Sequence, residues 1–232
     1  MPRSGTRSKK WGGKVSRKES SQWHETYRSD VLARRRLATH GKKLEKLGVL
    51  QSSRDSSILD VGCGEGEILE ILAQNSFDHS YGVDLVSTRD WLSIVSGKTW
   101  KYSAASADRL PFREFSMDWI LCAHSLHHLW PVRNIAAFLS SAKYCLKEKG
   151  RLALVDHYDS PQFRVALSLI LSPLAGLTPL TREMRKQHLE EKENIWGYVR
   201  DWRLVKAAIE DSGLKTVTFQ KGLFFFYWVL QK

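Results

Sequence analysis

The chain has 232 residues, 42% of them hydrophobic, which suits a globular protein that can bury a core of its own. Its net charge of +11 is unevenly placed, because residues 1–18 contain seven basic and no acidic side chains. Residues 1–20 lack the apolar segment of a signal peptide, and the longest uncharged run, 165–181, is too short and too proline-rich to favour a membrane span.

The three cysteines, Cys63, Cys122 and Cys145, are odd in number and lack metal-ligand spacing. We therefore expect a reducing, cytoplasmic compartment and no metal site. Residues 1–20 form a basic tail, rich in serine, glycine, lysine and arginine, that we expect to be disordered. Such a tail can serve as a solubilising arm, or it can contact nucleic acid or an anionic membrane surface.

Residues 21–50 have the apolar spacing of an amphipathic helix, which Gly48 can end. From residue 57 onward, short apolar runs alternate with helical patterns. We expect strands at 57–61, 80–85, 99–104, 117–123 and 151–156, and helices at 65–74, 91–95 and 134–146. This alternation predicts an α/β fold with a parallel sheet that helices cover on both faces.

The alternation breaks after Asp156. Residues 157–197 read as an insertion of roughly two helices, which we expect to form a helical cap. A helix at 201–213 and strands at 214–219 and 223–230 follow. We expect residues 21–232 to form a single domain that carries this cap.

A glycine-rich turn stands between the first strand and its helix, in the sequence ILDVGCGEGEIL (58–69). Glycines at Gly62, Gly64 and Gly66 permit a tight turn and let a ligand approach the backbone. The helix that follows offers free N–H groups at its start. Asp84 ends the second strand, where a carboxylate can accept hydrogen bonds from both hydroxyls of a ribose.

Two residues of this motif distinguish between candidate cofactors. A dinucleotide-binding loop, G-x-G-x-x-G, would need glycine at the position of Glu67. Asp60 would repel a pyrophosphate but suits a cationic ligand. S-adenosylmethionine carries an ammonium and a sulfonium and no phosphate, so the motif favours it.

Five segments then occur in a characteristic order. They are LDVGCGEG (59–66), YGVDL (81–85), ASADRLPF (105–112), FSMDWILCAHSLHHL (115–129) and LKEKGRLALVD (146–156). On these segments the chain resembles the class I S-adenosylmethionine-dependent methyltransferases, specifically the type 11 group that includes the ubiquinone and menaquinone C-methyltransferases. The resemblance implies a Rossmann-like, seven-stranded, mostly parallel sheet whose last strand is antiparallel, and S-adenosyl-L-methionine as cofactor.

The resemblance also implies which residues contact the methionine end of the cofactor. Asp60 would lie near its ammonium group. The residues along its methionine chain and sulfonium would be Gly62, Cys63, Gly64 and Gly66 in the glycine loop, and Cys122 and Ala123 at the end of the fourth strand.

A second group of residues would recognise the nucleoside. Asp84 would hold the ribose, and Leu85 would pack on the adenine. Ser106 stands where the family usually has an aspartate that bonds the adenine amino group, and a serine can still accept one hydrogen bond. Ala107 would offer its backbone N–H to the ring, and Asp108 is the next acid along the chain.

Candidate catalytic bases follow the fourth and fifth strands, because ligands in such sheets lie beyond the carboxyl ends of the strands. The methyl donor is already activated, so alignment of a nucleophile matters most, and a hydroxyl or acidic carbon also needs a base. The candidates are His124, His127, His128, Asp156, His157, Tyr158 and Asp159. We single out His127 and His157, since histidine titrates near neutrality. The alternative is that LHHL (126–129), a frequent pattern in the family, is a structural turn.

The sequence lacks two signatures of nucleobase methylation, a Pro-Pro-aromatic loop after the fourth strand and a proline followed by cysteine. The apolar stretch at 163–180 can line a pocket for an apolar molecule, rest on a membrane surface, or pack in its own core.

We therefore expect methyl transfer to an oxygen or carbon of a small, apolar or lipid-like metabolite, with peripheral contact to a membrane as a further interaction. One alternative is methylation of RNA, or of a protein recruited by the basic tail. A second alternative is a cofactor-binding protein that has lost catalysis.

Overall fold

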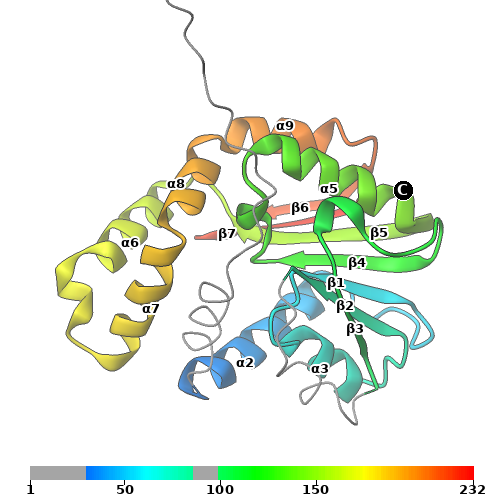
Figure 1. The fold of residues 1–232 in the computed structure, drawn as a ribbon, viewed down its shortest axis with the longest axis horizontal. Helices are drawn as coiled ribbons and strands as arrows, with labels where there is room; N and C mark the ends of the chain where they lie inside the picture. Colours follow the sequence, from blue (N-terminus) through cyan, green and yellow to red (C-terminus); the bar gives the residue numbers. More distant parts are fainter. Residues whose placement is uncertain (1–29, 86–98) are drawn as a thin grey trace, which may run out of the picture.

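The computed structural model describes residues 30–85 and 99–232, and Figure 1 shows their arrangement around one central sheet. The sheet has seven strands in the order β3-β2-β1-β4-β5-β7-β6. They are β1 (Ile58–Val61), β2 (Ser80–Asp84), β3 (Lys101–Ala104), β4 (Met117–Ala123), β5 (Leu146–His157), β6 (Lys215–Lys221) and β7 (Phe225–Gln231). The first five pair in parallel and β7 is antiparallel to both β5 and β6, which confirms the expected sheet.

Helices cover both faces of this sheet (Figure 1). On one face lie α2 (Asp30–Lys46) and α3 (Glu67–Gln74), and on the other α5 (Val132–Cys145) and α9 (Trp202–Glu210). Each face has its own cluster of buried apolar side chains, one around Leu69 and Leu72 of α3 and the other around Phe138 and Leu139 of α5. The central strand β1 is buried along its whole length, as a strand of a parallel sheet covered on both faces should be.

The expected end of the first helix at Gly48 is confirmed. Gly48 has a φ of +78°, in the left-handed region where only glycine is unstrained. Its N–H donates to the carbonyl of Glu45 at 3.0 Å, and the N–H of Val49 donates to Leu44 at 3.0 Å. The helix cap therefore satisfies carbonyls that the end of α2 would leave unpaired.

The insertion after β5 differs from the expectation of two helices, since it has three. They are α6 (Pro161–Leu171), α7 (Pro179–Glu190) and α8 (Lys192–Arg200), with a short 3-10 turn, η3 (Pro173–Gly176), between the first two. The hydroxyl of Ser160 accepts the N–H of Phe163 at 3.1 Å and begins α6, while Thr178 caps α7 by accepting from Thr181 at 3.2 Å. These caps divide a continuous apolar stretch into separate helices.

One further boundary differs from expectation, and two expected segments lie outside the described residues. β5 begins at Leu146, five residues before the expected start, because Leu146 pairs with Met117 across an irregularity in β4. The expected helix at 91–95 and the basic tail at 1–20 lie outside the described residues. Within the described ranges, no helix is both long enough and apolar enough to cross a membrane.

The order of the strands determines where a ligand can bind. β1 lies between β2 and β4, so the chain leaves β1 toward one side of the sheet and later returns on the other. Ligands of open parallel sheets bind beyond the carboxyl ends of the strands at such a reversal. The glycine loop after β1, the acid that ends β2 and the histidines after β4 and β5 all lie at this edge.

Candidate cofactor and acceptor site

The three glycines of the loop all have left-handed backbones, with φ values of 72° at Gly62, 49° at Gly64 and 82° at Gly66. Added side chains would meet different surroundings. A Cβ on Gly62 would lie 2.4 Å from Oγ of Ser125, and one on Gly66 would lie 2.9 Å from the ring of Trp100. A Cβ on Gly64 would meet nothing within 4 Å. The protein's own packing thus requires glycine at two positions, and Gly64 is the one that leaves space beside its backbone.

Hydrogen bonds hold this loop against the end of β2. The N–H groups of Gly62 and Cys63 both donate to the carbonyl of Val83, at 2.8 and 3.1 Å. The N–H of Gly64 donates to the Asp84 carboxylate at 3.0 Å. The predicted partners in cofactor binding, the loop and Asp84, are therefore joined directly. Ser125 supports the loop from the other side by donating to the carbonyl of Gly62 at 3.1 Å.

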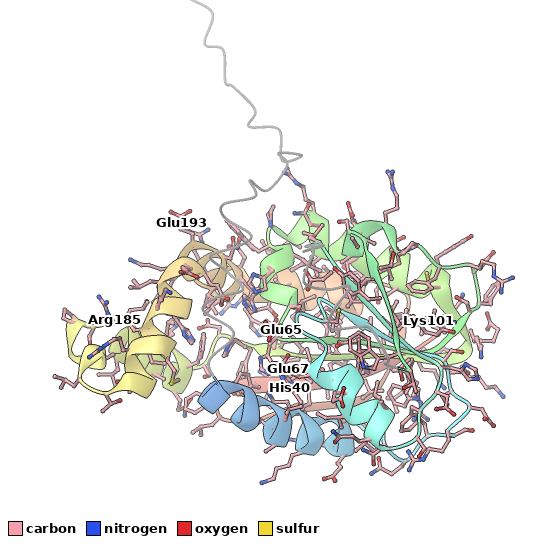
Figure 2. The ribbon with its side chains drawn as sticks, turned by 60° about the horizontal axis from the view of Figure 1, so that its bottom comes forward. His40, Glu65, Glu67, Lys101, Arg185 and Glu193 are labelled. Atoms are coloured by element: carbon pink, nitrogen blue, oxygen red, sulfur yellow. The ribbon has the colours of Figure 1, made fainter. Side chains whose placement is uncertain are left out.

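Three acidic residues, Asp60, Glu67 and Asp84, gather at the loop. Asp60 is only 2% exposed, and its burial, followed by the charges of Glu67 and Asp84, raises the pKa of Asp60 to about 8. Figure 2 shows Glu65 and Glu67 at the start of α3, next to this loop. A cationic ligand would relieve the repulsion among these groups, whereas a phosphate would add to it.

The two cysteines predicted at the cofactor are both buried. Cys63 is 4% exposed, and its sulfur lies 2.8 Å from where a Cβ of Gly82 would stand, so its side chain packs under the loop against β2. Cys122 is fully buried in the core cluster on the α5 face, although Ala123 beside it is half-buried. Burial raises the pKa of both thiols well above the ordinary value. Cys63 can therefore offer a ligand its backbone, and neither thiol is a nucleophile.

The predicted nucleoside residues follow β2 and β3, at neighbouring points of the same edge. Asp84 pairs with Ala104 in the sheet, and Ser106 comes two residues later at the start of the 3-10 turn η1 (Ala107–Arg109). Ala107 is buried, whereas Leu85 is 64% exposed directly after Asp84. The last residue predicted for this group, Asp108, is exposed.

A buried pair joins the ends of β4 and β5. His127 lies in the 3-10 turn η2 (Leu126–Leu129), and its Nδ1 is 2.9 Å from the Asp156 carboxylate, which also accepts the His127 backbone N–H at 3.0 Å. Burial alone would lower the pKa of His127, but the carboxylates of Asp156 and Glu191 raise it to about 10. His127 therefore holds its proton at neutral pH, which disfavours it as a general base.

The second predicted base, His157, has different surroundings. Its ring stacks on Phe163 of α6, with centroids 4.1 Å apart, and lies 4.6 Å from the ring of Phe225. Burial lowers the pKa of His157 to about 3, so the imidazole is neutral at physiological pH. Within the described part of the chain, its buried Nδ1 makes no hydrogen bond. A pKa of about 3 also makes the neutral His157 a weak base, so neither of the two histidines titrates near neutrality.

Two charged residues that sequence reasoning missed belong to this site. Lys43 of α2 contacts the Nε2 of His124, lies 5.0 Å from the ring of Phe225, and has its pKa lowered by burial to about 8. Glu191, between α7 and α8, lies 3.6 Å from Nε2 of His127. Lys43 is one of six basic residues in α2, so nothing in the sequence distinguishes it.

Among the described residues, two groups of side chains at this site have donor atoms close enough to share a metal ion. In each group the donor atoms lie within 4.8 Å of one another. The groups are His124, Asp156 and His157, and His127, His128 and Glu191. Sequence spacing indicated neither, because each group combines residues from separate elements.

A comparison with known families identifies the core of this fold. Residues 59–154 match the family described as "Methyltransferase domain". This segment of the chain is thus similar to a methyltransferase domain. The match begins within β1, just before the glycine loop, and ends within β5, before Asp156 and His157.

Similar proteins agree with this assignment. The chain is 29% identical over 126 residues to the uncharacterized methyltransferase YcgJ of Bacillus subtilis, in a match that covers 49% of this chain and 47% of that protein. The chain thus spans about half the length of this curated relative.

Two solved structures share the fold. The S-adenosylmethionine-dependent methyltransferase of Aquifex aeolicus has a TM-score of 0.60 at 18% identity, with 91% of this chain and 97% of that one covered. The Burkholderia thailandensis 1,6-didemethyltoxoflavin-N1-methyltransferase, solved with 1,6-didemethyltoxoflavin and S-adenosylhomocysteine, has a TM-score of 0.56 at 19% identity, covering 91% and 84%. The fold of this chain is that of S-adenosylmethionine-dependent methyltransferases, which confirms the expected fold class.

Proposed function

We propose that the methyltransferase domain transfers the methyl group of S-adenosylmethionine to an oxygen or carbon of a small, apolar or lipid-like metabolite. The negative, glycine-lined edge at β1 and β2 would hold the cofactor. The cap would receive the acceptor, and the observation that carries this assignment is the exposure of large apolar side chains on the cap.

Several large apolar side chains of the cap are exposed. On α6, Val165 and Leu169 are 60% and 63% exposed, although Phe163 and Leu167 of the same helix are buried. Leu177 is 80% exposed beyond α6. The apolar stretch is therefore more than the core of the cap, and an exposed apolar surface of this kind favours an apolar ligand or a lipid surface.

The cap also carries exposed basic side chains. Arg182 and Lys186 of α7 are exposed, and Figure 2 shows Arg185 of the same helix at the outer end of the cap. A cap that exposes both basic and apolar side chains suits an anionic lipid bilayer. Peripheral contact with the cytoplasmic face of a membrane is therefore part of the proposal.

The cap is also in contact with the catalytic candidates, since Phe163 of α6 stacks on His157. An acceptor held between the cap and the cofactor would lie near this histidine. Bound S-adenosylmethionine would supply the activated methyl group and would leave as S-adenosylhomocysteine. The neutral imidazole of His157 would then be the candidate to accept the proton that the acceptor oxygen or carbon loses.

A small acceptor is consistent with the Burkholderia structure, in which a fold of this kind binds 1,6-didemethyltoxoflavin. The proposal can be tested by incubating the protein with methyl-labelled S-adenosylmethionine and fractionated cell extract. We expect the label to enter the organic phase and a chain without residues 1–18 to retain this activity. Label in RNA or protein that is lost with residues 1–18 would support the alternative that the basic tail recruits the substrate. Cofactor binding without label transfer to any fraction would indicate a protein that has lost catalysis.

A further inference from the structure

The cap and the turn after β4 meet at three side chains whose ligand atoms converge. His127 and His128 lie next to each other in η2, with ring centroids 4.2 Å apart. Glu191 lies opposite, 3.6 Å from Nε2 of His127 through one carboxylate oxygen and 3.8 Å from Nε2 of His128 through the other. Two imidazoles and one carboxylate form a donor set typical of zinc and of related divalent transition metals.

The orientation of His127 is that of a metal ligand. Its Nδ1 is held by both oxygens of Asp156, at 2.9 and 3.0 Å. Its Nε2 is buried, makes no hydrogen bond within the described residues and lies 3.6 Å from the Glu191 carboxylate, so an ion bound there would displace the proton that His127 otherwise holds. A carboxylate on one ring nitrogen, with the other nitrogen directed at the ion, is the usual arrangement around a metal-binding histidine. Asp156 would thus fix the ring without binding the ion.

The distances match those of a compact coordination sphere. With metal–nitrogen bonds of about 2.0–2.1 Å and metal–oxygen bonds of about 2.0–2.2 Å, neighbouring ligand atoms of a tetrahedral site lie roughly 3.3–3.5 Å apart. The distances from the two Glu191 oxygens, 3.6 and 3.8 Å, exceed this range by only a few tenths of an ångström, and the three donor atoms all lie within 4.8 Å of one another. Small side-chain rotations would bring all three donors to one ion.

The neighbouring group of His124, Asp156 and His157 is less suited to a cation. Both oxygens of Asp156 are occupied, since they accept the backbone N–H groups of His127 at 3.0 Å and His157 at 2.7 Å. Lys43 also contacts the Nε2 of His124, so its ammonium group would repel a second cation there. Of the two groups, the one formed by His127, His128 and Glu191 is therefore better suited to bind a cation.

We propose that His127, His128 and Glu191 bind one divalent transition-metal ion, with zinc as the preferred ion. Two of the ligands come from η2 and the third from the junction of α7 and α8, so the ion would connect the cap to the sheet. Three protein ligands are the number found in zinc sites that keep one position for a water molecule or a substrate oxygen. The site goes beyond methyl transfer and does not depend on it.

The experiment measures metal binding by the full chain, first freed of metal with a chelator. Titration calorimetry with Zn²⁺ should show one site, and Co²⁺ should give the visible absorption of a tetrahedral complex. Glu191→Gln and His128→Gln should each weaken Zn²⁺ binding by more than the roughly 10- to 100-fold that loss of an outer partner costs. The matched control is His79→Gln, which alters an exposed histidine after α3 and should bind as the unaltered chain does.

Circular dichroism of each variant would separate loss of a ligand from loss of the fold. Absence of a one-to-one Zn²⁺ complex in the unaltered chain would overturn the proposal, and would indicate that a proton on His127 is the group held between Asp156 and Glu191. Equal binding by a folded Glu191→Gln variant would overturn it as well. Because metal binding is measured without a methyl acceptor, failure here leaves the proposed reaction untouched.

Discussion

Asp84 and Gly64 are joined by a hydrogen bond, in which the backbone N–H of Gly64 donates to Oδ2 of the Asp84 carboxylate at 3.0 Å. The acid at the end of β2 therefore has two tasks. One oxygen holds the glycine loop in place, and the carboxylate is also the group that we expect to receive the ribose. A substitution of Asp84 by alanine would remove both functions at once.

Asparagine at position 84 should separate these two tasks. Its amide oxygen can still accept the N–H of Gly64, but its other end donates and cannot accept a ribose hydroxyl. We expect Asp84→Asn to weaken S-adenosylmethionine binding by about 1.5–3 kcal/mol, the value of a hydrogen bond to a charged group, with little change in Tm. Asp84→Ala should lower both affinity and Tm. Calorimetry and thermal unfolding measure the two effects, and unchanged affinity in both variants would refute the ribose assignment.

The raised pKa of Asp60 predicts that cofactor binding depends on pH. At neutral pH this carboxyl is mostly protonated, since its pKa is about 8, and a cationic ligand favours the charged form. Binding should therefore release a proton, and affinity should increase with pH, by up to about tenfold per unit, until about pH 8. Calorimetry in two buffers that differ in ionisation enthalpy counts the protons released.

Asp60→Asn provides the control for this titration and a second observable. The folded chain holds a proton on Asp60 that the unfolded chain loses near pH 4, so Asp60 destabilises the free protein progressively as pH rises from about 4 to 8. The substitution Asp60→Asn should remove this pH-dependent destabilisation. We expect the variant to gain more Tm at pH 8 than at pH 5, and to release fewer protons on binding the cofactor. Equal gains in Tm at pH 5 and pH 8 would contradict a raised pKa of Asp60 in the folded chain.

The glycine loop allows a comparison between two alanine substitutions. Gly62→Ala would force its Cβ to 2.4 Å from the Ser125 hydroxyl, in addition to the left-handed strain that both positions share. We expect Gly62→Ala to cost about 1–3 kcal/mol more than Gly64→Ala in free energy of unfolding. Gly64→Ala, whose Cβ meets nothing within 4 Å, should mainly weaken binding of the cofactor, which we expect to pass beside Gly64. Chemical denaturation and cofactor titration of both variants provide the test.

Much of the cofactor edge could be predicted because it depends on local sequence. A strand, a turn and the start of a helix follow one another within 58–69. The turn needs left-handed residues, so the glycines at Gly62, Gly64 and Gly66 predict its backbone conformation directly from the sequence. Asp84 could be predicted for the same reason, since it ends an apolar strand in the adjacent position of the sheet.

The acceptor side depends on tertiary contacts and could be predicted only in part. The histidines after β4 were visible in the sequence, but their protonation was not. The carboxylates of Asp156 and Glu191 keep His127 charged, whereas burial keeps His157 neutral, although the two histidines stand at neighbouring strand ends. Lys43 and Glu191 reach the site from α2 and from the cap, which lie far from β4 in the sequence.

The exposed apolar surface of the cap gives the last prediction. Leu169 on α6 and Leu204 on α9 are 63% and 61% exposed, so either can become serine at a cost within about 0.5 kcal/mol of folding stability. If the cap receives an apolar acceptor, Leu169→Ser should reduce label transfer into the organic phase on the order of tenfold at limiting extract, because burying a leucine is worth about 1.5–3 kcal/mol. Leu204→Ser should leave transfer unchanged, and cofactor affinity should stay constant in both. An equal loss in the two variants would mean that the α6 surface has no particular role in holding the acceptor.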